Sequence, residues 1–213
     1  MRVLLISDVH GNLPALEKVL RKENSADQVI SLGDVVNYGP WSNECVDLLK
    51  ETGAINLIGN HEEYFILGSY SGTTLVRQFF DVCYRDFNRI DIIKEYRPEY
   101  LIGKFICRHT VDDLYVFSDT PVSITNNIFI GHSHVQFMRT VNNFLLVNTG
   151  SVGQNRREIN VINYAIYDTE SDEVILKELV YDYQVVIQKM REKNYPQECL
   201  NYYLGKNTRQ VNQ

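Results

Sequence analysis

The sequence lacks the features that mark several specialised classes of protein. No apolar run approaches the roughly 20 residues that a membrane-spanning helix needs. Lysine and arginine do not offset the acidic residues, so the formal net charge is −6 at pH 7. A protein that binds nucleic acids or membrane surfaces generally needs a basic surface. The composition therefore argues against a membrane protein and against general nucleic-acid binding.

Cysteine is scarce as well. The four cysteines are far apart and form no C-x-x-C pair, so the sequence indicates neither a disulfide framework nor a closed zinc site. The N-terminal apolar stretch runs directly into Asp8 and His10, which is typical of a first strand and not of a signal peptide. These observations favour a reduced, cytoplasmic location.

No repeat, linker or low-complexity segment divides the chain. Its 213 residues are enough for one domain with a well-buried core, and its apolar content of 44% is that of an ordinary globular protein. We therefore expect a single domain over residues 1–204 and a frayed polar tail over residues 205–213.

The first part of the chain alternates between strand and helix patterns. Strands are expected at residues 2–7, 28–32 and 54–58, and helices at residues 13–23 and 42–50. Asn12 can cap the first of these helices. Strands separated by single helices predict parallel pairing through right-handed crossovers.

The rest of the chain is first helical and then rich in strands. Apolar residues recur at spacings of three and four between residues 62 and 96, which predicts a helical region. Strands are expected at residues 104–109, 114–117, 127–131, 137–141, 144–148, 161–168 and 173–179, and closing helices at residues 181–193 and 197–204. A parallel half followed by an antiparallel half predicts an α/β fold, a four-layer α-β-β-α sandwich in which two mixed sheets pack face to face with helices outside.

All five histidines lie in short turn-like segments, most of which follow runs of β-branched and aliphatic residues. The segments are Asp8-Val9-His10, Gly33-Asp34, Gly59-Asn60-His61, His109 and Gly131-His132-Ser133-His134. Active-site ligands are usually placed at the ends of strands. The pattern therefore predicts a metal site, with two metals.

The residue types in these segments suit transition metals. Asp8 and His10 are two positions apart at the end of a strand, so strand alternation would point both to one side. His132 and His134 repeat this spacing, and the two carboxylate oxygens of Asp34 could bridge two cations. Mixed oxygen and nitrogen donors suit Mn, Fe, Zn, Co or Ni better than Ca.

These segments resemble the signature of the calcineurin-like metallophosphoesterase superfamily, which is D-x-H, G-D, G-N-H-[DE], a lone H and G-H-x-H. All of them occur here in that order between residues 8 and 134. Residues 148–154, Asn-Thr-Gly-Ser-Val-Gly-Gln, are similar to a segment of the compact bacterial and archaeal phosphodiesterase branch. The resemblance therefore covers most of the chain.

The resemblance implies a role for each matching residue. The first metal would be held by Asp8, His10 and His134, the second by Asn60, His109 and His132, and Asp34 would bridge the two. His61 would be the catalytic histidine, which binds no metal and stabilises the transition state or protonates the leaving oxygen. The cofactors would be two divalent transition-metal ions, with Mn as first choice and Fe, Zn, Ni or Co as alternatives. They would share a hydroxide that attacks phosphorus in line.

Some residues depart from the family pattern. Thr110 follows His109 where the family usually has Gly, and Thr149 replaces the usual Pro. Asn37 and Tyr38 stand where the protein Ser/Thr phosphatases carry Asp-Arg. Loss of that arginine removes a bidentate phosphate clamp, which argues against a dedicated phosphoprotein phosphatase.

Two further residues are candidates for substrate binding. Asn12 could donate to a phosphate oxygen, although capping of the helix explains it equally well, and it could do both. Arg156 could contact the substrate, although such an arginine is most often a surface charge. Glu62 is expected to be solvated or to orient a ligand.

The function that these observations favour is hydrolysis of phosphoric esters, with a nucleotide or similar small diester as substrate at an open active site. A phosphomonoesterase or a hydrolase of dinucleoside polyphosphates is the alternative, since the compact branch includes both. A non-catalytic metal-binding scaffold is a third hypothesis, which the presence of His61 and of every ligand type disfavours. The expected partner is a small phosphorylated substrate, and the resemblance also suggests a homodimer.

Overall fold

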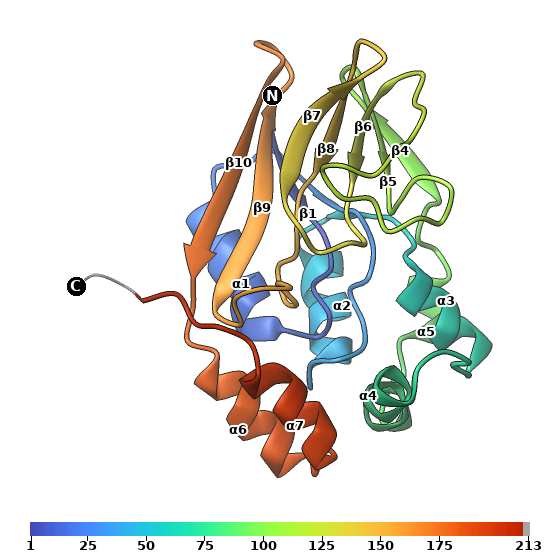
Figure 1. Cartoon of the computed structure of the whole chain (residues 1–213), viewed down its shortest axis with the longest axis vertical. Coiled ribbons are helices and arrows are strands. Elements are labelled where there is room, and N and C mark those ends of the chain that lie inside the picture. Colours follow the sequence, from blue (N-terminus) through green and yellow to red (C-terminus); the bar gives the residue numbers. More distant parts are fainter. Residues whose placement is uncertain (211–213) are drawn as a thin grey trace.

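The structure, a computed structural model, describes residues 1–210 as two five-stranded sheets with helices (Figure 1). The strand order of the first sheet is β10-β9-β1-β2-β3, and these strands span Glu173–Val180, Val161–Asp168, Arg2–Ile6, Gln28–Ser31 and Ile55–Asn56. The strands β1, β2 and β3 are parallel, as the alternation of strands and helices predicts. β9 is antiparallel to both β1 and β10, so the sheet is mixed.

The second sheet is mixed too. Its order is β4-β5-β6-β8-β7, and the strands span Glu99–Ile102, Phe105–Arg108, Asn127–Ile130, Phe144–Asn148 and Phe137–Val141. The three central strands are parallel, and the edge strands β4 and β7 are antiparallel to their neighbours. The expected α/β fold with two mixed sheets is therefore confirmed.

The two sheets pack face to face because β1 is apolar on both sides. Val3 and Leu5 lie in the core between the sheets, where Phe105 of the second sheet also packs. Leu4 and Ile6 point the opposite way and pack among the helices. Successive side chains of a strand point to opposite faces, so a strand buried on both faces needs the continuous apolar run that this segment has.

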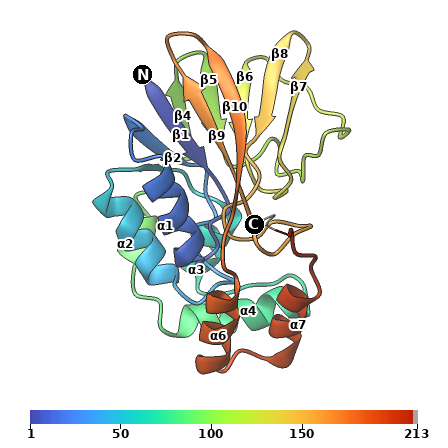
Figure 2. The same ribbon diagram turned by 90° about the vertical axis from the view of Figure 1, so that its left-hand side faces the viewer.

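Helices cover the outer face of the first sheet and one end of the molecule. Figure 2 shows α1 (Leu13–Lys22) and α2 (Ser42–Glu51) beside this sheet, whereas α4 (Thr74–Arg85), α6 (Gln184–Glu192) and α7 (Gln197–Leu204) are grouped at the lower end. No helix among residues 1–210 is long and apolar enough to cross a membrane.

The outer face of the second sheet differs from the expected fourth layer, because a loop covers it in place of helices. Val116 and Ile124 of this loop, residues 110–126, pack against Ile128 and Leu146 of the sheet. Residues 114–117, which we expected to form a strand, belong to this loop. Their apolar composition was misleading, because only Val116 among them is buried.

The helical region expected over residues 62–96 is divided into α3 (Asn60–Leu67), α4 and α5 (Ile90–Ile93). α3 ends at Gly68, whose φ of 69° is the left-handed conformation that glycine favours after a helix. The strand β4 was not predicted. It pairs with β5 across a tight turn at Gly103, so its partner strand and not its own periodicity stabilises it.

The tail expected to fray is held to the domain over much of its length. The Lys206 ammonium donates to Gln154 Oε1 over 2.7 Å, and Arg209 pairs with Glu158 and Glu178. Residues 206–209 therefore form part of the domain, and residues 211–213 lie outside the described residues.

Candidate metal centre

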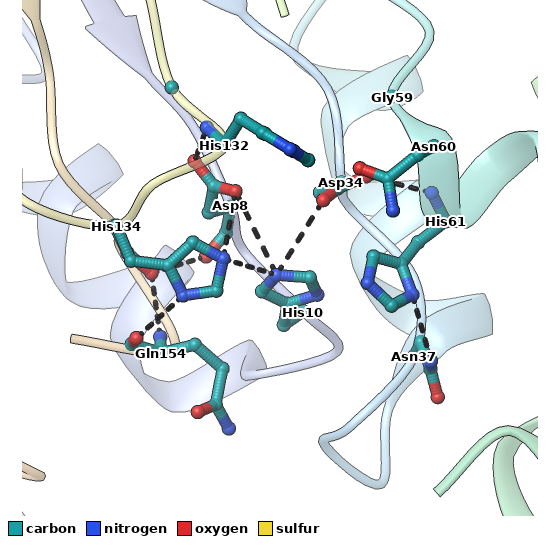
Figure 3. A network of polar contacts seen from close by, with 12 residues as sticks. Asp8, His10, Asp34, Asn37, Gly59, Asn60, His61, His132, His134 and Gln154 are labelled. Carbon is teal, nitrogen blue, oxygen red and sulfur yellow. Dashed lines mark hydrogen bonds and ion pairs between the residues drawn. The ribbon is translucent and has the colours of Figure 1, made fainter. Parts of the chain in front are cut away.

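The predicted metal ligands meet at one end of the two sheets, and Figure 3 labels all of them except His109. Asp8 and His10 follow β1, Asp34 follows β2, Asn60 begins α3 after β3, His109 follows β5, and His132 and His134 follow β6. Parallel strands of one sheet have their carboxyl ends at the same edge. Packing of the sheets face to face then brings the two edges together.

A first group of donors consists of Asp8, His10, Asp34 and His134, whose ligand atoms all lie within 4.8 Å of one another. Nε2 of His134 is 3.1 Å from Asp8 Oδ1 and 3.1 Å from Nε2 of His10. Nε2 of His10 is 3.8 Å from a carboxylate oxygen of Asp8 and equally far from one of Asp34. All four residues are buried. The group could hold one cation with nitrogen and oxygen donors.

A second group shares Asp34 with the first. The ligand atoms of Asp34, His109 and His132 also lie within 4.8 Å of one another. Nε2 of His109 is 3.2 Å from Asp34 Oδ2, 3.1 Å from His132 Nδ1 and 3.2 Å from Asn60 Oδ1. The carboxylate of Asp34 therefore lies where it could bridge two cations.

Backbone carbonyls determine which ring nitrogens face the first group. Nδ1–H of His10 donates to the Val36 carbonyl over 3.1 Å, and Nδ1–H of His134 donates to the Gln154 carbonyl over 2.8 Å. In the neutral rings both Nε2 atoms then carry lone pairs, and these atoms lie 3.1 Å apart. Oδ1 of Asp8 is also buried without a hydrogen-bond partner. Lone pairs that converge in this way repel one another unless a cation lies among them, so the donors fit a divalent metal.

The charges of the centre shift the pKa of its members. Although burial raises the pKa of Asp8, the His134 imidazole beside it outweighs that effect and lowers the pKa to about 2. Burial, aided by His109, lowers the pKa of His132 to about 4. Burial also acts to lower the pKa of His109, but the Asp34 carboxylate outweighs it and raises that pKa to about 10. Ionised carboxylates and neutral imidazoles are the forms that bind metals, so Asp8 and His132 are ready to bind, whereas a metal at His109 has to displace the proton of its ring.

Most of these residues adopt backbone conformations that are uncommon outside glycine. Their φ angles are 53° at Asp8, 48° at His10, 57° at Asp34, 64° at His132 and 58° at His134. The expected strand alternation therefore does not apply to Asp8 and His10, since each turns out of the extended chain. Residues in such conformations cost about 1–3 kcal/mol each and cluster at functional sites. Asp and His tolerate them better than most residues.

Glycines beside the ligands let the strand ends approach one another. A Cβ at Gly131 would overlap Ser7 Oγ and the Asp8 carboxylate, and a Cβ at Gly59 would overlap the Asp34 side chain. The glycines of the G-H-x-H and G-N-H segments therefore allow β6 to reach β1, and β3 to reach β2.

The Glu62 carboxylate holds the turn that carries Asp34. It is fully buried and accepts backbone N–H groups from Asp34 at 2.7 Å, Val35 at 2.8 Å, Val36 at 3.1 Å and Gly59 at 2.9 Å. Of the two expectations for Glu62, solvation or orientation of a ligand, the geometry supports the second.

His61 lies beside the centre but belongs to neither donor group. Its ring centroid is 4.9 Å from that of His10, and its backbone N–H donates to Asp34 Oδ1 over 2.9 Å. Asn37 Nδ2 donates to Nδ1 of His61 over 2.8 Å, and Asn37 Oδ1 accepts the Tyr38 N–H, which fixes the orientation of the amide. Nε2 of the neutral His61 ring is therefore the nitrogen that carries the proton. Burial lowers the pKa of this ring.

Asn12 has the contacts of the helix cap that we expected as one of its two roles, and its contact with phosphate stays a prediction. Its side chain is fully buried, and its Oδ1 accepts the Ala15 N–H at the start of α1. Its Nδ2 donates to the Gly153 carbonyl and to the Tyr181 hydroxyl. With these bonds made, the capping role accounts for Asn12.

Arg156 lies beside the centre, as a substrate-binding residue would. Its Nε donates over 3.2 Å to the carbonyl of Ser133, which stands between His132 and His134. Its guanidinium lies over the ring of Tyr115, 5.7 Å from the centroid, and the residue is exposed to solvent.

Asn37 and Tyr115 were not predicted as neighbours of the site. Asn37 attracted notice only as a departure from the phosphatase pattern, although its place three residues after Asp34 was a usable signal. Tyr115 stacks on His132 with 4.1 Å between ring centroids. No sequence signal marks Tyr115, because its position depends on the path of the loop over residues 110–126.

Comparisons with known proteins give consistent matches. The calcineurin-like phosphoesterase family model matches residues 1–186. An uncharacterized protein of Methanocaldococcus jannaschii is 28% identical in an alignment that covers 92% of this chain and 94% of that protein. A metallophosphoesterase from Sphaerobacter thermophilus has a similar crystal structure, with a TM-score of 0.79 and 26% identity over 96% of this chain and 98% of that one. Phosphodiesterase YfcE of Escherichia coli K12 is 45% identical over 42 residues, 19% of this chain and 23% of YfcE.

Proposed function

Because the chain belongs to the calcineurin-like phosphoesterase family, we propose that it hydrolyses small phosphodiesters, such as nucleotides, with two divalent metal ions. Family membership supports hydrolysis of phosphoric esters in general. The proposal goes further in three respects: the enzyme prefers diesters, it uses a pair of metals, and the residues named below hold them.

One observation carries the proposal, namely two groups of buried donors that converge and share Asp34. The first metal would be held by Asp8, His10 and His134, and the second by Asn60, His109 and His132, with Asp34 between them. Mixed carboxylate, amide and imidazole donors suit Mn, Fe, Co, Ni or Zn, and Mn is our first choice for assays. When bound, two such ions neutralise phosphate oxygens and lower the pKa of water enough for it to attack near neutral pH.

His61 would act on the substrate from beside the metals. Because Nδ1 of its ring accepts a hydrogen bond from Asn37, the neutral ring has its proton on Nε2. That proton can be donated to a phosphate oxygen or to the oxygen of the departing alcohol. Burial lowers the pKa of His61, which keeps the ring neutral near pH 7 before substrate binds.

The charges near the centre support a diester. Arg156 lies beside the centre without a carboxylate partner among the described residues, whereas Arg108 is paired with Glu99. A phosphodiester carries one negative charge, whereas a phosphomonoester carries about 1.5 to 2 negative charges at neutral pH. A centre with so little additional positive charge suits the less charged substrate.

The first test is hydrolysis of bis-p-nitrophenyl phosphate beside p-nitrophenyl phosphate with added Mn²⁺, for the wild type and for His61→Ala. We expect a preference for the diester, and a kcat about 10²–10⁴ times lower in the variant, since general acid catalysis contributes that much. Binding of Mn²⁺ to His61→Ala is the control, because His61 belongs to neither donor group.

Each other outcome contradicts a named part of the proposal. A preference for the monoester would point to the phosphatase alternative. Mn²⁺ binding without hydrolysis of either compound would point to a scaffold or to a pyrophosphate bond as the target. An active His61→Ala variant would exclude His61 from catalysis.

A further inference from the structure

A pocket of about 490 Å³ borders the second donor group. Asn60, His109 and His132, which would hold the second metal, form part of its lining. Its volume lies in the range of small-molecule sites and exceeds what a phosphate group alone would need. A phosphate bound at the metals would therefore have an adjoining space on this side for the rest of the substrate.

Two tyrosines from separate parts of the chain line this pocket. Tyr64 comes from α3, and Tyr115 comes from the loop that covers the second sheet. Ile58 and Pro98 add apolar surface. Tyr115 is 53% exposed, so the part of its ring that His132 and Arg156 leave uncovered is available to a ligand. Its stacking on His132 also places it next to the predicted metal position. Flat apolar walls of this kind favour an aromatic ring.

The charged residues of the pocket disfavour an anionic ligand. Glu63 and Asp113 are both exposed and both line it. Arg108 also lines it, but its guanidinium donates twice to Glu99 Oε2, at 2.9 and 2.5 Å. The lining therefore offers hydrogen-bond acceptors to hydroxyl and amino groups, and its two carboxylates disfavour a second phosphate or a carboxylate there. Arg156, which lies over the ring of Tyr115, is not part of this lining.

We infer that this pocket binds the organic part of the phosphoester and selects an uncharged aromatic group such as a nucleoside. This inference rests on the proposed function. The phosphate lies at the two metals, and the nucleoside extends from it past His132 into the space between Tyr64 and Tyr115. The ribose hydroxyls and the amino groups of the base have Glu63 and Asp113 as acceptors. Substrates with further phosphates or carboxylates in this part are rejected by the same two residues.

Binding of monoester products tests the pocket separately from catalysis. Mn²⁺-loaded protein is titrated calorimetrically with adenosine 5′-monophosphate and with methyl phosphate, which share the phosphate group and differ in the organic part. Because stacking of a base on aromatic side chains strengthens binding, we expect adenosine monophosphate to bind about tenfold tighter or more.

Matched variants test whether the aromatic rings of the two tyrosines, and not other changes in the protein, cause the difference in affinity. Tyr64→Leu and Tyr115→Leu should each remove most of this tenfold difference, and Tyr64→Phe and Tyr115→Phe should retain it. Methyl phosphate should bind all four variants as it binds the wild type, which also shows that they are folded and loaded with metal.

The acidic residues have a test of their own. Glycerol 3-phosphate and 3-phosphoglycerate form a second pair, in which only the latter has a carboxylate beyond the phosphate. We expect the wild type to bind glycerol 3-phosphate several-fold tighter, and the doubly substituted Glu63→Gln/Asp113→Asn protein to lose that discrimination.

The outcomes distinguish failure of this inference from failure of the proposed function. Equal affinity for adenosine monophosphate and methyl phosphate in the wild type overturns the inference, and so does a difference that persists in both leucine variants. Tight, tyrosine-dependent binding of adenosine monophosphate without hydrolysis of any diester supports the pocket and contradicts the activity. Binding of neither monoester contradicts both.

Discussion

At the scale of single residues, Glu62 shows how a carboxylate that touches no substrate can determine the geometry of a site. It accepts hydrogen bonds from the backbone N–H groups of Asp34, Val35, Val36 and Gly59. Among the described residues, no other side chain accepts from these four groups. Two strand ends are thus tied to one side chain. Asp34, the ligand shared by both donor groups, depends on it for its position.

Glu62→Gln should lower the free energy of unfolding by about 3 kcal/mol. An amide has one acceptor oxygen in place of two, so its NH₂ group would face backbone N–H donors and leave some of them unsatisfied. Urea unfolding measures the loss. Glu63→Gln, a substitution of the same kind at the exposed neighbour, should change the value by less than about 0.5 kcal/mol. Equal effects of the two substitutions would contradict the anchoring role.

Residue types and spacing were sufficient to predict which side chains gather at the centre. Histidine and aspartate beside glycine at strand ends indicate ligands whatever the details of the turns. The capping role of Asn12 was predicted, but the partners of its Nδ2 and the role of Asn37 could not be, because they depend on which residues the amides reach. Asn12 meets Tyr181, 169 positions away in the sequence, and no local pattern encodes that contact.

At the scale of elements, the strands and helices with strong periodicity were predicted well, and those stabilised by their neighbours were not. The strand β1 and the helix α1 have clear patterns, and the structure places them within a residue or two of the predicted bounds. The strand β4 is short and half exposed, and it exists because β5 offers it a partner. Residues 114–117 have strand-like composition but no strand beside them to pair with.

The segment after α7 supplies a prediction on pH. Burial, with a contribution from Arg156, lowers the pKa of Lys206 to about 7, below the 10.5 of a free lysine. Between these values the unfolded chain binds more protons than the folded one, so the free energy of unfolding rises with pH. Below pH 7 Lys206 is protonated in both the folded and the unfolded chain, so its contribution to the free energy of unfolding no longer changes with pH.

Lys206→Met should remove that rise. Urea unfolding between pH 6 and 10 should show the wild type gaining stability relative to the variant above pH 7, by up to about 1.4 kcal/mol per pH unit. Lys18→Met, at an exposed position of α1, controls for the loss of a lysine. A difference between wild type and Lys206→Met that does not change with pH would contradict the expectation.

At the scale of the whole molecule, the centre connects the two sheets. Asp8 and His10 come from the first sheet, and His132 and His134 come from the second. Side chains that repel one another without a cation therefore lie where the sheets meet. Metal binding should stabilise the entire domain and not merely the loops that carry the ligands.

We expect Mn²⁺ at about 100 times its Kd to add about 2.7 kcal/mol to the stability of the protein, relative to protein in a chelator. For a domain of this size that corresponds to a rise in Tm of roughly 5–10 °C, measured by differential scanning calorimetry. In Asp34→Asn, which alters the ligand shared by both groups, the rise should be much smaller. An equal Tm with metal and with chelator would show that the donors hold no ion.

The separation of the ligands along the chain also bears on how the protein is made. His10 and His134 meet across 124 positions of sequence. A ribosome needs on the order of ten seconds to synthesise that length. A nascent chain that ends before β6 has only part of the donor set and can hold a cation only loosely. Metal capture is thus tied to synthesis of the chain past His134, and a chain released before that residue leaves no finished centre in the cell.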